Sequence, residues 1–140
     1  MSYTIEDLFI GKIARMQRIF TDEEVKVCEK LTRDNSPVYN VEDDIWKHHY
    51  HQPIVPGLLA EGLINQVISE KLPGVACVLL QKELIFYLPV YVGDIITAEL
   101  EIIDINMERN WVTQKVACFN QNGSEVIKGQ VVVVILTNQN

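Results

Sequence analysis

The segment that most constrains the fold runs from residue 57 to residue 72 and reads GLLAEGLINQVISEKL. Its apolar residues recur at helical spacing around most of the circumference, and only Glu61, Gln66 and Glu70 form a narrow polar stripe. Pro73 and Gly74 follow directly and predict the end of this helix. Because a helix this apolar must be surrounded by other elements, the rest of the chain has to supply a broad covering surface.

The second half of the chain has the composition and alternation typical of β-strands. Within residues 94–107, every second side chain from Ile96 to Ile102 is apolar, so one face of this strand is predicted to be buried; it carries Ile96, Ala98, Leu100 and Ile102. Further strands are predicted within residues 75–90, 111–119 and 124–136, joined by YVGD, ERN and NQNG. These joins are short, so most neighbouring strands are expected to form antiparallel hairpins.

The first half begins with an alternating stretch, residues 9–20, and then changes period. Thr21 precedes Glu24 by three residues, which is the signature of a capping box at a helix N-terminus. Pro37 and the residues just before it are expected to close this helix, because the residue before a proline avoids the α conformation. An irregular segment then leads to Pro56.

These elements predict a single α+β domain over residues 1–140, with an antiparallel sheet wrapped around the central helix. The outer face and the edge strands of such a sheet need protection. A second copy of the chain would supply it, so a homodimer is expected.

Composition narrows the class of partner. A formal charge of −7 argues against nucleic acid as a partner. The chain lacks both a run of about 18 apolar residues and a basic, apolar leader at its start, so no membrane span and no secretory signal are expected. Three cysteines, far apart and odd in number, suit a reducing compartment and not a disulfide framework. A cytoplasmic protein that binds small molecules is the resulting expectation.

The loop between the two helices gathers candidate site residues, each of which has an ordinary structural explanation. Asp34 alone would be a helix-ending aspartate that binds nearby backbone, and Gly57 after a proline makes a tight turn. His48, His49 and His51 fall within four residues, but they lack the H-x-x-x-H spacing and any nearby cysteine. No metal site is therefore expected.

Several motifs together resemble the MaoC-like, (R)-specific enoyl-CoA hydratases of the hot-dog fold. The resemblance covers nearly the whole chain through FIGKIARMQRIFTDEEV, DNSPVY, QPIVPGLL, LPVYVGD and GQVVVVIL. It implies a hot-dog fold, a homodimer and the hydration of trans-2-enoyl thioesters, carried by CoA or by an acyl-carrier protein, to (R)-3-hydroxyacyl thioesters. It also implies that the reaction needs no metal and no redox cofactor.

The family signature, Asp-x-Asn-Pro-x-His, implies the roles of individual residues. In the family the acid and the imidazole hold the attacking water, and a backbone amide at the start of the buried helix binds the thioester oxygen. Matched onto this chain, the acid is Asp34, the proline is Pro37, and the amide belongs to Gly57. A helix N-terminus suits that oxygen because free N–H groups favour developing negative charge.

Three positions depart from the family pattern. Ser36 replaces the asparagine, Tyr39 replaces the catalytic histidine, and Pro56 replaces the usual histidine of the PIV-x-G turn. With an ordinary pKa near 10, a tyrosine donates hydrogen bonds but accepts protons poorly at neutral pH. One alternative is that a loop imidazole, His49 or His51, swings over the pocket and replaces the missing one.

Two functions therefore remain open from the sequence. The first is a hydratase or dehydratase with an altered catalytic pair, Asp34 and Tyr39. The second is a hot-dog protein that binds acyl thioesters without hydrating them, which the changes at Tyr39 and Pro56 favour. Thioesterase activity fits the fold but not the hydratase-type loop.

Overall fold

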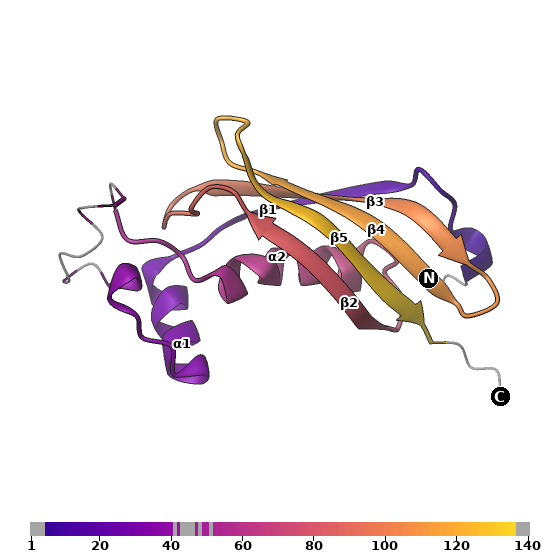
Figure 1. Cartoon of the computed structure of the whole chain (residues 1–140), viewed down its shortest axis with the longest axis horizontal. Helices are drawn as coiled ribbons and strands as arrows, with labels where there is room; N and C mark the ends of the chain where they lie inside the picture. Colours follow the sequence, from indigo (N-terminus) through magenta and orange to yellow (C-terminus); the bar gives the residue numbers. More distant parts are fainter. Residues whose placement is uncertain (1–4, 41, 43–46, 48, 51, 137–140) are drawn as a thin grey trace.

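The computed structural model describes residues 5–40, 42, 47, 49–50 and 52–136. A five-stranded antiparallel sheet curls over the central helix α2, and the shorter helix α1 lies at one end of the molecule (Figure 1). This confirms the predicted α+β arrangement. The elements in chain order are η1 (Ile5–Asp7), β1 (Ile13–Ile19), α1 (Asp22–Thr32), η2 (Pro37–Tyr39), α2 (Gly57–Glu70), β2 (Cys77–Phe86), β3 (Ile95–Asn106), β4 (Trp111–Phe119) and β5 (Glu125–Ile135), where η marks a 3₁₀ turn.

The core forms where α2 meets the concave face of the sheet. Leu63 and Val67 of the helix are fully buried, as are Leu100 and Ile102 of β3, so the apolar face predicted for that strand is confirmed. Each such side chain contributes about 1.5–3 kcal/mol when it leaves water. In the described part of the chain, no helix has the length and apolarity needed to cross a membrane.

Helix α1 begins as predicted and ends earlier than predicted. The Thr21 hydroxyl accepts the Glu24 amide at 3.2 Å, and the Glu24 carboxylate accepts the Thr21 amide at 3.0 Å, which completes the capping box. At the other end the helix stops at Thr32, because Arg33 takes a left-handed conformation with φ of 61°. Asp34 therefore lies outside the helix.

The strand order is β1-β3-β4-β5-β2, which corrects part of the hairpin prediction. β3–β4 and β4–β5 are hairpins joined by short turns, as expected. The YVGD segment does not close a hairpin, because β3 already has β1 and β4 as its two neighbours. β2 pairs instead with β5 and becomes an edge strand.

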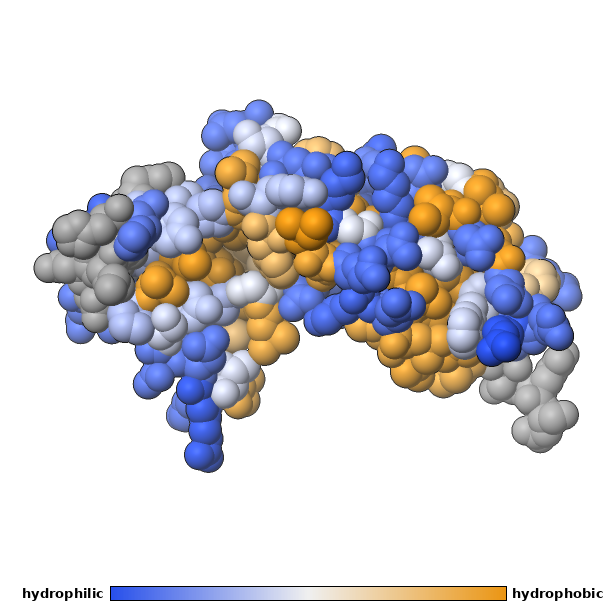
Figure 2. Space-filling model, in the orientation of Figure 1, coloured by the Kyte–Doolittle hydropathy of each residue, from blue (hydrophilic) through white to orange (hydrophobic). Residues whose placement is uncertain are grey.

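The outer face of the sheet and the β2 edge differ in character. On the outer face Arg15 of β1 and Glu99 of β3 form an ion pair at 2.6 Å. Charged side chains of this kind can face water on one side of an antiparallel sheet. The cover expected for this face stays a prediction. Along β2, by contrast, the large apolar side chains of Val78, Leu80 and Ile85 are exposed. Figure 2 shows apolar surface gathered at the lower edge of the molecule, where Figure 1 places this strand.

We predict that Gly129→Ala strongly destabilises the fold. A Cβ atom on Gly129 of β5 would lie 1.8 Å from the backbone carbonyl oxygen of Glu83 on β2, so the two strands would have to separate. Overpacking of this kind costs about 1–3 kcal/mol or more of the free energy of unfolding, measurable by thermal or urea denaturation. The matched control is Gly62→Ala inside α2, where nothing lies within 4 Å of the new Cβ. There alanine should be neutral or stabilise by up to about 1 kcal/mol. Equal melting temperatures for Gly129→Ala and the unmodified protein would contradict the β2–β5 register.

Candidate active site

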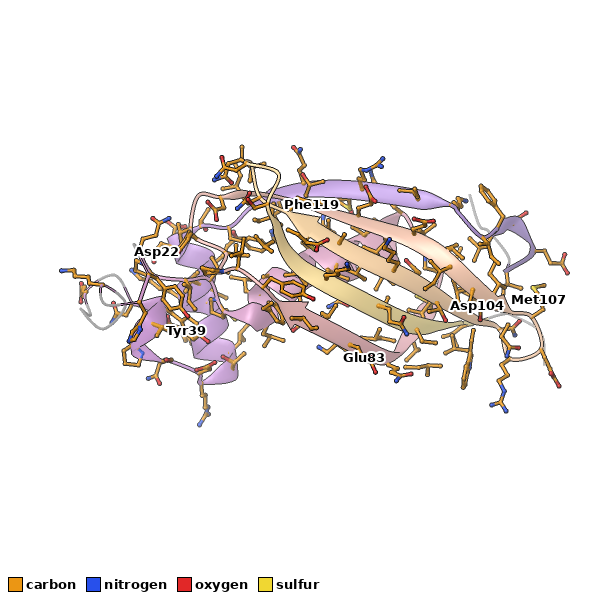
Figure 3. All side chains as sticks on the ribbon, turned by 45° about the horizontal axis from the view of Figure 1, so that its top comes forward. Asp22, Tyr39, Glu83, Asp104, Met107 and Phe119 are labelled. Atoms are coloured by element: carbon orange, nitrogen blue, oxygen red, sulfur yellow. The ribbon has the colours of Figure 1, made fainter. Side chains whose placement is uncertain are left out.

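The structure brings Asp34 and Tyr39 together at the C-terminal end of α1. The η2 turn reverses the chain between them, and the Tyr39 hydroxyl donates a long hydrogen bond of 3.5 Å to Asp34 Oδ2. The backbone amide of Asp34 donates to the Thr32 hydroxyl at 3.2 Å, which ties the carboxylate to the helix end. Figure 3 shows Tyr39 beside α1, at the opposite end of the molecule from Met107.

The two side chains differ in environment. Asp34 is exposed, whereas Tyr39 is half-buried and packs against the core. Burial, followed by the negative charge of Asp34 and the hydrogen bond to it, raises the pKa of Tyr39 above its ordinary value of 10.0. The phenol therefore keeps its proton at neutral pH. The pair offers one proton acceptor and one proton donor to a molecule bound between them.

Backbone hydrogen bonds hold this loop against the start of α2. The amide of Ile54 donates to the carbonyl of Val38 at 3.0 Å, three residues before the helix begins. The carbonyl of Pro56 then accepts the amides of the first helical turn. Within the described residues, no backbone hydrogen bond is formed by the amides of Gly57 and Leu58. These two N–H groups are available to an oxygen of a bound molecule.

A cleft of about 280 Å³ opens at this helix start. A Cβ atom added to Gly57 would approach the ring of Phe86 to 3.4 Å, so glycine keeps the space between the helix and β2 open. The cleft is mainly apolar, and its lining includes Tyr50, Ile54, Gly57, Ala60, Phe86 and Leu88.

The remaining predicted residues are placed as follows. Ser36 precedes η2, and its side chain forms no capping hydrogen bond; Pro56 precedes α2 and is buried. The exposed ring of His49 lies 6.4 Å, centroid to centroid, from the ring of Tyr50, which lines the cleft. His51 lies outside the described residues. Among the described residues, His49 is therefore next in sequence to a residue of the cleft lining but is not itself part of that lining.

No three side chains among the described residues form a group suited to a metal ion, and two of the three histidines, His48 and His51, are not described.

One neighbour of Asp34 and Tyr39 was missed by the sequence analysis. Cys28 is buried on α1, and burial, then the charge of Asp34, raises the pKa of its thiol. Its place four residues before Thr32 and on the same face as Val25 indicated a core position and no chemical role.

A second missed interaction involves α2. Glu61 was assigned to the narrow polar stripe of the helix; its side chain is mostly buried and accepts a hydrogen bond of 2.6 Å from the Lys82 ammonium on β2. Helical spacing alone could not find this contact, because it depends on how β2 crosses the helix.

Two curated proteins are similar to this chain over most of its length. An (R)-specific enoyl-CoA hydratase of Aeromonas caviae is 30% identical over 128 residues, which are 91% of this chain and 96% of that protein. A mitochondrial 3-hydroxyacyl-[acyl-carrier-protein] dehydratase of Solanum lycopersicum is 30% identical over 130 residues, 91% of this chain and 78% of that protein.

Among solved structures, the (R)-hydratase of A. caviae involved in PHA biosynthesis superimposes with a TM-score of 0.88 at 30% identity, over 94% of this chain and 99% of that one. No family model matches the sequence. The similarity to the curated hydratase extends over almost the full length of both chains and includes both the fold and the sequence. The chain therefore belongs to the MaoC-like (R)-specific enoyl-CoA hydratase family of the hot-dog fold.

Proposed function

We propose that this protein hydrates trans-2-enoyl thioesters, or dehydrates (R)-3-hydroxyacyl thioesters, with Asp34 and Tyr39 as its catalytic pair. The observation that carries the proposal is the 3.5 Å contact between the Tyr39 hydroxyl and the Asp34 carboxylate, on a loop tied to the start of α2. A water molecule at about 2.8 Å from each oxygen fits over such a pair. The chemistry uses protein groups alone, without a metal or a redox cofactor.

The proposed reaction divides the work between three groups. Asp34 takes a proton from the bound water, whose oxygen forms a bond to Cβ of the enoyl group. The thioester oxygen gains negative charge and is bound by the Gly57 amide, one of the two without a backbone partner. Tyr39 delivers a proton to Cα, and the proton held by Asp34 then returns to the tyrosinate across their hydrogen bond. The net change is the addition of one water molecule.

The raised pKa of Tyr39 sets the expected rate. A phenol with a pKa above 10 is a weaker acid than an imidazolium, so the protonation of Cα is slower than in a site with histidine. This supports a slow or specialised hydratase. Tyr39 also favours the competing candidate, because a tyrosine cannot act as a base at neutral pH. That candidate is a protein that binds acyl thioesters without hydrating them.

The substrate is proposed to be an acyl-CoA or an acyl-carrier-protein thioester. The curated relatives include proteins described as acting on each of these. The three cysteines, all free thiols in the structure, suit a reducing cytoplasm as the place of the reaction.

A homodimer is proposed through the β2 edge. This strand has only β5 as a neighbour, exposes apolar side chains on both faces, and runs antiparallel to its own copy when related by a two-fold axis. Pairing of two such edges satisfies the free backbone groups and covers Val78, Leu80 and Ile85 together.

We predict that Asp34→Asn lowers kcat/KM for crotonyl-CoA by about 10²–10⁴, because the amide is nearly isosteric but cannot accept the proton of water. The loss of enoyl absorbance measures the rate. Asp104→Asn serves as the control, since Figure 3 shows this aspartate at the far end of the sheet. An unchanged kcat/KM in Asp34→Asn would place the chemistry elsewhere.

Substitution of Tyr39 separates the two candidate functions. If Tyr39 supplies a proton, Tyr39→Phe lowers kcat/KM by about 10²–10⁴. If the site only binds, Tyr39→Phe changes little, whereas Tyr39→His creates or raises hydratase activity by placing an imidazole beside Asp34. Full activity in Tyr39→Phe together with no gain in Tyr39→His contradicts both accounts, and His49 and His51 become the next residues to substitute.

We predict that Ile85→Lys converts the proposed dimer to a monomer, because each copy would place a lysine charge in the apolar interface. Light scattering at micromolar concentration measures the mass. Ile103→Lys, at a position that is also exposed but lies on the inner strand β3 and away from the edge, should remain dimeric. If the unmodified protein is a monomer under these conditions, the proposed dimer through β2 is wrong.

A further inference from the structure

Helix α2 does not fill the whole space under the sheet. It packs closely against β1 and β3 and leaves a seam toward the edge strand β2. Helix and strand run in opposite directions along this seam, with Gly57 near Phe86 at one end. Any molecule that enters at the start of α2 has this seam as its route along the helix.

Two clefts open along the seam, one at each end of α2. The first, of about 280 Å³, contains the start of the helix. The second, of about 440 Å³, lies at the C-terminal end of the helix. The residues of α2 and β2 that line the first cleft are Gly57, Ala60 and Phe86. Those that line the second cleft are Asn65, Ile68, Cys77 and Leu79.

The ion pair of Glu61 and Lys82 lies between these clefts on both elements. Along α2, Glu61 comes after the residues of the first cleft and before those of the second; along β2, Lys82 lies between Leu79 and Phe86. The ammonium nitrogen is 2.6 Å from the carboxylate oxygen, and only 12% of the Glu61 side chain is exposed. The pair thus spans the seam from helix to strand.

The Lys82 side chain is 47% exposed, but the Glu61 carboxylate beside it is mostly buried and is a poor neighbour for a hydrocarbon chain. An acyl tail that passed it would have to displace the pair or lie against it, and a displaced Glu61 would lose its partner in a place with little water. The advance from Gly57 to Glu61 is about 6 Å along the helix axis. With C–C bonds of about 1.5 Å, that distance is roughly the reach of an acyl group of four to six carbons.

We propose that the Glu61–Lys82 ion pair divides the seam between α2 and β2 into two clefts and so restricts this protein to short acyl thioesters. The inference rests on the proposed function, because it takes the Gly57 amide as the thioester site. The pair is a specificity determinant and takes no part in the hydration step. Its removal joins the clefts into one channel along α2.

The test compares the binding of butyryl-CoA and octanoyl-CoA, two saturated thioesters that cannot be hydrated, by calorimetry. Unmodified protein is expected to bind butyryl-CoA at least about threefold more tightly than octanoyl-CoA, because the longer chain meets the ion pair and its extra methylenes find no apolar room. The double variant Glu61→Ala/Lys82→Ala should bind octanoyl-CoA at least tenfold more tightly than butyryl-CoA, since each buried methylene is worth about fourfold.

Two further variants distinguish the pair from a general loss of charge. The reversed pair, Glu61→Lys/Lys82→Glu, keeps an ion pair across the seam and should retain the short-chain preference. Arg15→Ala/Glu99→Ala removes an ion pair of the same length from the outer face of the sheet and should leave the preference unchanged. Melting curves verify that each variant is folded.

The outcomes separate this inference from the proposed function. Thioester binding with the same chain-length profile in the unmodified protein and in Glu61→Ala/Lys82→Ala overturns the partition and leaves the proposed function standing. Failure of the unmodified protein to bind either thioester overturns the proposed function, and the partition with it.

Discussion

The burial of one apolar helix is the constraint on which the rest of this structure depends. α2 carries apolar side chains around most of its surface, and four strands of the sheet, together with the extended β1, curl to enclose it. Fully buried residues such as Leu63 and Ile102 meet across this contact. Because the helix is held along its length, its first turn is held as well, and the unpaired amides at Gly57 and Leu58 have a defined position.

The candidate site is assembled from segments that the fold positions independently. The end of α1 and the η2 turn place Asp34 beside Tyr39, and the hydrogen bond from Ile54 to Val38 joins that loop to the entry of α2. In the proposed site a tyrosine stands where the resemblance places a histidine, and its hydroxyl donates a hydrogen bond to the carboxylate. Burial and the adjacent charge hold the proton on the phenol, so the pair has a single base.

The edge position of β2 has two consequences at once. It leaves apolar side chains and backbone groups of the strand exposed, which supports the proposed dimer, and it leaves α2 incompletely covered on that side. The resulting seam gives access to the helix start. The ion pair of Glu61 and Lys82 joins the helix to the strand between the two ends of this seam.

The sequence alone determined those features that arise from local periodicity and local chemistry. The capping box of Thr21 and Glu24, the buried face of β3, the apolar helix and its end before Pro73 all follow from neighbours a few residues apart. Resemblance to a known family added predicted roles for Asp34 and Gly57, which stay predictions. Only the tertiary structure decided that β2 crosses to β5, that Glu61 turns inward to Lys82, and that Tyr39 lies 3.5 Å from Asp34. Each of these depends on which distant segments pack together, and strand alternation or helical spacing repeats identically whichever partner is chosen.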